Sequence, residues 1–369
     1  MVLQELQLIN FKNYAEAKVR FEGLVHCFLG KNGSGKTNLL EAIHYLAFTK
    51  GSFHTHDLSN IRHSQDQFVI KGTIEKDEKK FELNCSFSAE RKKMLLENGV
   101  AYGRFSEHIG KYPLVFVAPN DIELIWDGGE VRRKFVDTLL SQTDKVYLEN
   151  LIIYQSHLRQ RNSALKMFAE RGVIDRDLMA TYDEKIVEAG NILHHKRLAF
   201  MTLYQTFLLD RYEFLSGTDE GAGMKYASDL DKVNFKDELI QNLERDVAAG
   251  RTTLGIHRDD FLFTINEHEL KRFGSQGQQK SFLIALKLAE FDYLVSKNGT
   301  KPLLLLDDIF DKLDDGRIHQ LMKLVTGGNF GQIFITDARP GRSLEVLKEA
   351  GVKSQNFLVE AGRVELMIA

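Results

Sequence analysis

One stretch decides the fold of this chain: Gly30-Lys31-Asn32-Gly33-Ser34-Gly35-Lys36-Thr37, which matches the phosphate-loop pattern G-x-x-x-x-G-K-[ST]. The apolar run from Val25 to Leu29 precedes it and predicts a strand, and a helical pattern follows from Thr37 to about Phe48. The alternative is a chance glycine-rich turn. Strand, loop and helix in this order argue against that alternative, because they let backbone N–H groups at a helix start face an anion.

The parts of this loop have distinct expected roles in binding ATP. Lys36 would reach the β- and γ-phosphates, and the Thr37 hydroxyl would ligate Mg²⁺. The glycines would let the main chain wrap closely around the phosphate oxygens. The candidate ATP-binding residues of this segment are Gly30, Lys31, Asn32, Gly33, Ser34, Gly35, Lys36, Thr37 and Asn38.

An acidic motif near the other end of the chain completes this pattern. The run Leu303 to Leu306 is wholly apolar, as expected of a central parallel strand covered on both faces, and Asp307 and Asp308 follow it directly. In P-loop proteins a carboxylate at this place lies near Mg²⁺. Asp307 is therefore a candidate metal residue with Thr37, and Asp308 is the candidate catalytic residue that would orient or deprotonate the attacking water.

The character of the sequence changes twice along the chain. Residues 1–120 and 251–369 read as mixed strands and helices, whereas residues 121–250 are mainly helical. Apolar residues recur at three- and four-residue steps from Leu151 to Phe168 and from Ile186 to Phe207, which predicts two long antiparallel helices. These helices could form an ordinary lobe or a projecting arm. The first and last portions are expected to share one sheet.

A third motif precedes the apolar strand. Ser275, Gly277 and Gln278 lie at the expected start of a helix, where they would offer a second anion-binding surface. Ser275-x-Gly277-Gln278 resembles the signature motif of ABC-type ATPases, and Leu313-Asp314 resembles their D-loop. The resemblance implies that Ser275, Gly277 and Gln278 bind the γ-phosphate held by a second copy of the chain. An ATP-dependent homodimer is therefore expected.

The number of residues between the phosphate loop and the signature motif distinguishes the branches of the ABC-type ATPase superfamily. Residues 38–273 lie between the phosphate loop and the signature motif, whereas transporter ATPases keep the two much closer. A long helical insertion resembles the SMC branch, although this one is too short for a very long coiled coil. We expect an α/β fold: an ABC-type, SMC-like P-loop ATPase head formed by residues 1–120 and 251–369, with residues 121–250 inserted as a helical lobe.

Finer motifs resemble the RecF family of bacterial recombination mediators, and they follow the order of that family over nearly the whole chain. They are the opening segment Leu8–Tyr14, an R-R-x-F-x-D segment in Val131–Asp137, an L-K-Q-R-N-x-x-L helix in Leu158–Leu165, G-x-H-R-D-D at Gly255–Asp260, S-x-G-Q-x-K at Ser275–Lys280 and L-D-D-I-F-x-x-L-D at Leu305–Asp314.

This resemblance implies a function in recombinational repair and replication. We expect the protein to bind single-stranded, gapped and duplex DNA as an ATP-induced dimer. Slow, DNA-dependent ATP hydrolysis would then release the DNA. It would support recombinase loading and the SOS response, with a RecR-type mediator as partner. The rival classes are a structural SMC-like chromosome-organising head, a P-loop metabolic kinase and a transporter ATPase. A kinase leaves the signature motif unexplained.

Several positions depart from the motifs of transporter ATPases and of the RecF family. Asp308 stands where transporter ATPases usually have Glu, and Thr336-Asp337 stands where a switch His is expected. His54 falls where the family commonly has Arg, so a contact with nucleotide or DNA there would be pH-sensitive or lost. Asp311 and Asp314 follow Asp308 at helical spacing, and solvated or helix-capping carboxylates are the alternative to a functional role. No convincing Q-loop glutamine is identified.

The overall composition limits how the chain could bind DNA. Its 369 residues carry a formal net charge of −3, so any DNA contact must come from a local basic face that meets the phosphate backbone. No leader peptide or membrane span is expected, and the default compartment is the cytoplasm. The local basic groups are Arg91-Lys92-Lys93, Arg132-Arg133-Lys134, Arg159 with Arg161, and Lys196-Arg197, and for each group taken alone a solvated face is the more common explanation.

Overall fold

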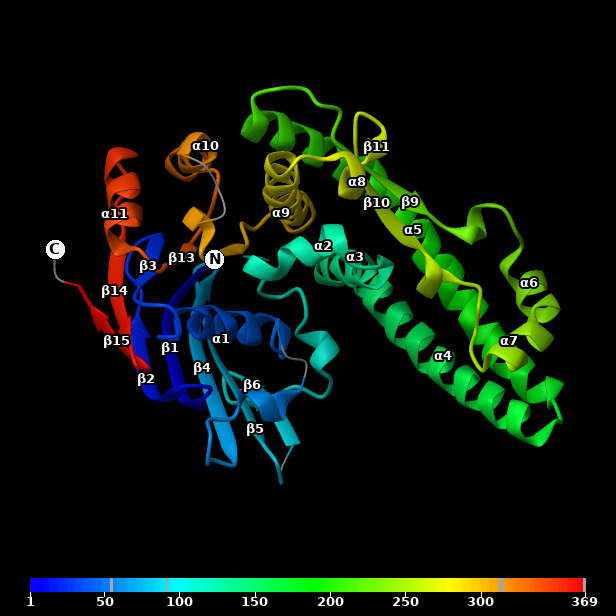
Figure 1. Cartoon of the computed structure of the whole chain (residues 1–369). Coiled ribbons are helices and arrows are strands. Elements are labelled where there is room, and N and C mark those ends of the chain that lie inside the picture. The colour runs from blue at the N-terminus through cyan, green and yellow to red at the C-terminus, as the bar shows by residue number, and fades with distance from the viewer. Residues whose placement is uncertain (54–55, 91, 312–314, 368–369) are drawn as a thin grey trace. The chain divides into compact units, whose positions relative to one another are not determined.

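The computed structural model describes residues 1–53, 56–90, 92–311 and 315–367. The chain forms two compact units, which are drawn together in Figure 1 and described here one at a time. Unit 1 comprises Met1–Asp121, Phe214–Gly217 and Lys280–Ala369, and unit 2 comprises Ile122–Glu213 and Thr218–Gln279.

A six-stranded sheet carries the phosphate loop of unit 1, in the order β15-β14-β3-β13-β12-β8. All neighbours pair in parallel except β14 with β15. The inner strands are buried along their whole length, which explains their mainly apolar sequences. The strands are β3 (Val25–Leu29), β8 (Leu114–Val117), β12 (Leu303–Leu306), β13 (Ile333–Asp337), β14 (Gln355–Glu360) and β15 (Arg363–Leu366).

A second, antiparallel sheet of unit 1 has the order β2-β1-β4-β5-β6-β7. The β4–β5 hairpin turns at Asp77 and Glu78, which both have positive φ, as a tight hairpin turn requires. Buried side chains from both sheets and from α1 form one hydrophobic cluster. The strands are β1 (Val2–Phe11), β2 (Tyr14–Arg20), β4 (Gln67–Lys76), β5 (Lys79–Ser88), β6 (Lys92–Glu97) and β7 (Val100–Ala101).

The helices of unit 1 follow its parallel strands. Helix α1 (Lys36–Phe48) comes after β3, α10 (Asp315–Thr326) after β12 and η6, and α11 (Pro340–Glu349) after β13. Most of α9 (Gln276–Asn298) also belongs to this unit. The short 3-10 helices are η1 (Asp57–Asn60), η2 (Phe105–Glu107), η3 (Pro119–Ile122) and η6 (Ile309–Asp311).

Two long helices dominate unit 2. Helix α4 (Lys145–Arg171) ends at Gly172, whose left-handed backbone closes the helix, and α5 (Arg176–Ser216) begins a few residues later. The predicted antiparallel pair is confirmed by cross-contacts in opposite chain order: Lys196 pairs with Asp144, near the start of α4, and Asp183 pairs with Arg161, further along it. Figure 1 shows the pair side by side.

A small sheet and short helices accompany this pair. The sheet order is β11-β10-β9. Strand β10 lies in the last portion of the chain, which was expected to share one sheet with the first, but it pairs with β9 and β11 rather than with the sheet that carries the phosphate loop. These elements are α2 (Glu123–Trp126), α3 (Gly129–Thr143), β9 (Gly223–Ala227), η4 (Asp229–Asp231), α6 (Phe235–Gln241), α7 (Leu243–Ala249), η5 (Ile256–Arg258), β10 (Asp260–Ile265), β11 (His268–Glu269) and α8 (Leu270–Phe273).

The strand pairing places residues 251–279 in the compact unit of the long helices, whereas the sequence pattern grouped them with the ATPase head. The division into a functional head and an inserted lobe stays a prediction. Among the described residues, no helix is long and apolar enough to cross a membrane.

Candidate nucleotide site

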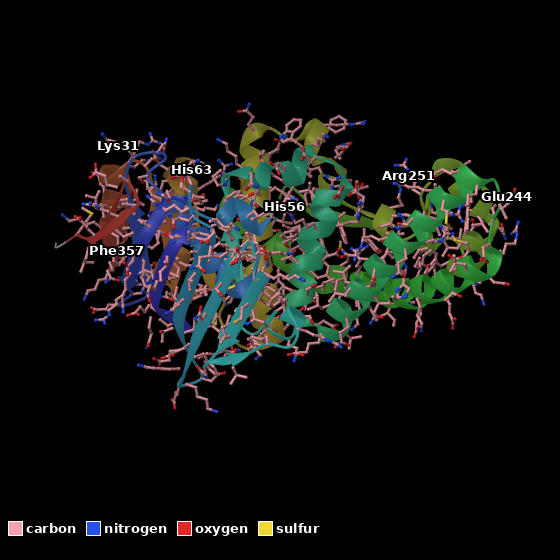
Figure 2. The ribbon with its side chains drawn as sticks, turned by 90° about the horizontal axis from the view of Figure 1, so that it is seen from below. Lys31, His56, His63, Glu244, Arg251 and Phe357 are labelled. Carbon is pink, nitrogen blue, oxygen red and sulfur yellow. The ribbon has the colours of Figure 1, made fainter. Side chains whose placement is uncertain are left out.

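The phosphate loop lies between the end of β3 and the start of α1. Gly35, directly before α1, has φ 115°, a left-handed conformation that favours glycine. The buried Lys36 ammonium donates to the carbonyl oxygens of Gly30 at 2.8 Å and Lys31 at 3.1 Å. The charged end of Lys36 is thus held within the loop, while the side chain of Lys31 is exposed (Figure 2).

Neighbouring segments hold the loop through its outward-facing carbonyl groups. Asn13 Nδ2 donates to the carbonyl of Ser34 at 3.0 Å, and the Tyr14 hydroxyl donates to the carbonyl of Gly35 at 3.0 Å. A Cβ on Gly30 would lie 2.2 Å from the carbonyl oxygen of Val359 in β14, so this close approach also requires glycine. Because these contacts occupy carbonyl oxygens, they orient the loop without using the N–H groups that would face an anion.

The two predicted metal residues meet in space although they lie far apart in the sequence. Thr37 Oγ1 donates to the carboxylate of Asp307, with both oxygens at 3.0 Å. A hydroxyl and a buried carboxylate side by side are the hard oxygen donors that Mg²⁺ prefers. The residues present therefore fit a magnesium ion, which would supply charge neutralisation to bound phosphates.

Asp308 adopts an unusual backbone conformation directly after the metal residue. Its φ is 47°, in the left-handed region, which costs roughly 1–2 kcal/mol for a residue other than glycine. Its N–H donates to Thr336 Oγ1 at 2.9 Å, and the same hydroxyl donates to Asp307 Oδ1 at 2.6 Å. Thr336 thus connects the carboxylate of Asp307, the predicted metal residue, with the main chain of Asp308, the predicted catalytic residue.

The electrostatics of Asp307 favour a cation beside it. Burial raises the pKa of this carboxyl above its ordinary value, and the nearby Asp308 acts in the same direction. Hydrogen bonds from Thr336 and Thr37 oppose the rise. A divalent cation would stabilise the ionised form strongly, because it places positive charge against a buried carboxylate.

The signature residues form a reciprocal cap at the start of α9. Gln278 N–H donates to Ser275 Oγ at 3.2 Å, and Ser275 N–H donates to Gln278 Oε1 at 2.8 Å. This is the capping-box arrangement, in which Ser and Gln three positions apart satisfy each other's backbone donors. Gln278 also donates to Glu220 at 3.2 Å. The cap orients an exposed Ser275 at a helix N-terminus, beside Gly277.

Asn38 takes part in the loop contacts in a way that its motif position does not reveal. Its Nδ2 donates to Asn13 Oδ1 at 2.7 Å, so it orients the side chain that holds Ser34. The loop residues Asn32 and Gly33 are exposed. Asn38 therefore supports the loop indirectly, through Asn13, whereas Asn32 and Gly33 lie at the surface of the loop.

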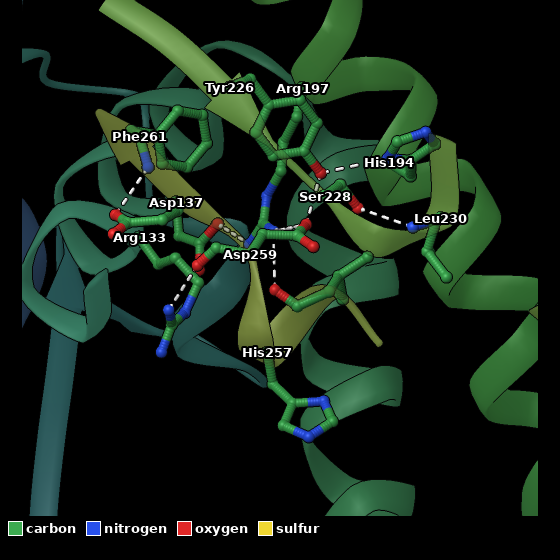
Figure 3. Close-up of polar contacts among 12 residues, drawn as sticks. Arg133, Asp137, His194, Arg197, Tyr226, Ser228, Leu230, His257, Asp259 and Phe261 are labelled. Carbon is green, nitrogen blue, oxygen red and sulfur yellow. Dashed lines mark hydrogen bonds and ion pairs between the residues drawn. The ribbon is translucent and has the colours of Figure 1, made fainter. Parts of the chain in front are cut away.

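The RecF-like motif segments of unit 2 meet in buried ion pairs. Arg132 forms a two-point pair with Asp260, at 2.8 Å for both bonds. Arg197, only 1% exposed, contacts Asp137 at 2.8 Å and Asp259 at 2.9 Å (Figure 3). These arginines therefore join α3, α5, Asp259 and the start of β10, and they are not free to meet DNA phosphates.

Arg161 of α4 is likewise internal, with an exposed fraction of 0%. It donates to Asp183 at 2.6 Å and to Asp246 at 2.6 Å. Of the basic groups considered for DNA, Lys92, Lys134 and Arg159 are exposed. Lys93 pairs with Asp57 at 2.9 Å.

Some predicted positions lie outside the described residues: His54, Arg91 and the D-loop-like Leu313-Asp314.

Sequence reasoning missed Thr336 and Asn13 as supporting residues of the site. Thr336 was noted only for the missing His, and Asn13 only as part of a family-like opening segment. The strand order of the sheet would have indicated Thr336, because β13 lies between β3 and β12.

The fold and this site define an ATPase head of the ABC and SMC class. Solved SMC heads share the fold: the Pyrococcus furiosus SMC head domain with an extended coiled coil has a TM-score of 0.55 at 14% identity and covers 99% of this chain and 95% of that one. The match to the family model "RecF/RecN/SMC N terminal domain" spans residues 2–359.

Full-length similarity narrows the class to one family. "DNA replication and repair protein RecF" of Flavobacterium johnsoniae is 43% identical over 94% of this chain and 97% of the relative, and that of Bacteroides thetaiotaomicron is 42% identical over 100% and 99%. A solved "recombination mediator protein RecF-ATP in RecFOR pathway" has a TM-score of 0.88 at 28% identity, covering 99% of this chain and 97% of that one. The chain belongs to the RecF family of DNA replication and repair proteins.

Proposed function

We propose that this chain is an ATP-dependent DNA-binding switch of recombinational repair. The observation that carries the proposal is the meeting of Thr37 and Asp307, which joins the phosphate loop and the acidic strand into one site for ATP and Mg²⁺. Lys36 binds the β- and γ-phosphates, and Asp308 orients the attacking water. The related solved structure of RecF with ATP supports the choice of nucleotide.

A second copy of the chain completes the site. The exposed, capped Ser275 lies at a helix N-terminus with Gly277 and Gln278, a suitable group for contacting the γ-phosphate held by the partner. Only the triphosphate offers this contact, so ATP favours the closed dimer and slow hydrolysis reverses it. The closed dimer holds single-stranded, gapped or duplex DNA through its phosphates, independently of sequence.

The proposed substrates and the family indicate where the protein acts, in which process and with which partner. Because its proposed substrates are chromosomal DNA and ATP, the protein would act in the bacterial cytoplasm, in repair, replication and the SOS response. The related solved RecF protein acts in the RecFOR pathway, which supports a RecR-type mediator as partner. The chromosome-organising alternative has less support, since the SMC heads resemble this fold much less closely than the RecF structure does.

Light scattering with and without ATP and gapped DNA tests the dimer. Wild type should double in mass with ATP and DNA, whereas Lys36→Arg and Ser275→Arg should stay monomeric. Ser163→Arg, at another exposed serine of unit 2, is the matched control and should behave as wild type. A Ser275→Arg protein that dimerises normally would remove the basis of the shared site.

DNA binding at several salt concentrations tests the rest of the proposal. ATP should tighten binding, and the affinity should fall steeply with salt because phosphate contacts release counterions. The same affinity with ATP, with ADP and without nucleotide would contradict an ATP-controlled switch.

A further inference from the structure

The penultimate residue of the strand between the two nucleotide motifs contacts both acidic residues of the site. In the parallel sheet of unit 1, β13 pairs with β3 on one side and with β12 on the other. Its residue Thr336 is fully buried, at 0% exposure. Because the carboxyl ends of parallel strands lie at one sheet edge, Thr336 lies between the phosphate loop and the acidic pair.

The Thr336 hydroxyl has a defined donor and acceptor arrangement. It donates its hydrogen to Asp307 Oδ1 at 2.6 Å and accepts the N–H of Asp308 at 2.9 Å. A hydroxyl has one donor and can accept as well, so both contacts form at once. Asp307 also accepts from Thr37, and these two hydroxyl donors fix the orientation of its carboxylate.

The second contact holds a turn of the main chain. Asp308 follows the end of β12 and has φ 47°, a conformation that residues other than glycine rarely adopt unless the surroundings require it. The hydrogen bond from its N–H to Thr336 stabilises this turn, which directs the Asp308 side chain away from the path that a continuing strand would give it.

We propose that Thr336 is a positioning residue for ATP hydrolysis: its hydroxyl sets the place of Asp308 relative to Asp307. This inference rests on the proposed function, because it assigns a task to Asp308. Thr336 itself touches neither nucleotide nor water in this role. Loss of its hydroxyl should slow hydrolysis about 10- to 100-fold, the effect expected when a reacting group is displaced by up to 1 Å.

Three substitutions separate the hydroxyl from the volume of the side chain. Thr336→Val keeps the shape and removes the hydroxyl, whereas Thr336→Ser keeps the hydroxyl and removes a methyl group. For each protein, kcat and KM for ATP would be measured with DNA and Mg²⁺, together with binding of a fluorescent ATP analogue and the lifetime of the dimer on DNA. If Thr336→Val does not fold, Thr336→Cys takes its place, because a thiol is a weak donor of similar size.

The proposal predicts a split between catalysis and binding. Thr336→Val should lose kcat with KM and analogue binding nearly unchanged, and its dimer should remain on DNA longer. Thr336→Ser should retain most of the wild-type kcat. A Thr336→Val protein with wild-type kcat overturns the inference, as does a Thr336→Ser protein equally impaired, which would indicate packing alone. A wild-type chain that binds no ATP would instead overturn the proposed function.

Discussion

Thr37 Oγ1 lies 3.0 Å from each carboxylate oxygen of Asp307, although 270 positions separate the two residues in the chain. Parallel strands β3 and β12, each followed by one of these residues, make the contact possible with β13 between them. Under the proposed function this pair would supply oxygen donors for Mg²⁺, and the consequences can be measured.

Removing the Thr37 hydroxyl should weaken the binding of Mg²⁺ at the nucleotide site. Thr37→Val should raise the Mg²⁺ concentration needed for half-maximal binding of a fluorescent ATP analogue by about tenfold, which corresponds to about 1.4 kcal/mol. Thr37→Ser, which keeps the oxygen, should remain near wild type. Equal Mg²⁺ requirements for the valine and serine proteins would argue against Thr37 as a metal residue.

The contact between Tyr14 and the phosphate loop should contribute to nucleotide affinity. Tyr14→Phe removes the hydroxyl that donates to the Gly35 carbonyl, and the loss of one hydrogen bond of about 1 kcal/mol should weaken ATP binding roughly fivefold. Tyr45→Phe is the control, because that hydroxyl bonds to Asp57 instead. Calorimetric titration would give both affinities. The prediction fails if both variants bind ATP equally.

The buried arginine of α4 should be important for stability. Arg161→Met leaves Asp183 and Asp246 without their shared cation, and breaking such a buried pair should lower the free energy of unfolding by about 3 kcal/mol. The unfolding temperature should fall by roughly 6–12 °C for a unit of this size. Arg159→Met, at an exposed arginine two positions earlier, should unfold near the wild-type temperature. Similar melting curves for the two variants would contradict a stabilising role.

Arg159 should instead influence DNA binding. If its exposed guanidinium meets a phosphate, Arg159→Met should weaken binding to all sequences alike and reduce the salt slope by about one. Fluorescence anisotropy with gapped DNA at several salt concentrations measures both effects. An unchanged affinity and slope would exclude Arg159 from the DNA surface.

The buried His26 should make unit 1 less stable in mild acid. Burial lowers the pKa of His26 to about 4 from an ordinary 6.5. The folded chain therefore stays neutral at this site while the unfolded chain takes up a proton below pH 6.5. Stability should be fully present above that pH and fall by up to about 1.4 kcal/mol per pH unit toward pH 4.

Thermal unfolding at pH 7.5 and 5.0 tests this dependence. His26→Gln should lose less stability on acidification than wild type, whereas His63→Gln, at an exposed histidine, should follow wild type. The loss will not vanish, because burial also lowers the pKa of His257 to about 4. An unaltered pH dependence in His26→Gln would show that another group is responsible.

Much of the fold could be predicted because local patterns carry it. The apolar runs gave β3 and β12 correctly, and the three- and four-residue spacing gave the long helices. The pairing of β10 was predicted wrongly, since its sequence resembles any half-buried strand and its partner β9 lies in a stretch read as helical. Local spacing reports the period of an element but not its neighbour in a sheet.

The sequence by itself determined the motifs, their order and the family, because glycine, lysine and acidic residues at these spacings are required by phosphate and metal chemistry. Only the tertiary structure decided which side chains serve the site indirectly. Arg132, Arg161 and Arg197 look like solvent-facing cations in sequence, yet they are buried against carboxylates contributed by distant segments. Thr336 becomes important only because β13 lies between β3 and β12. Such contacts depend on packing between distant segments, which no local pattern records.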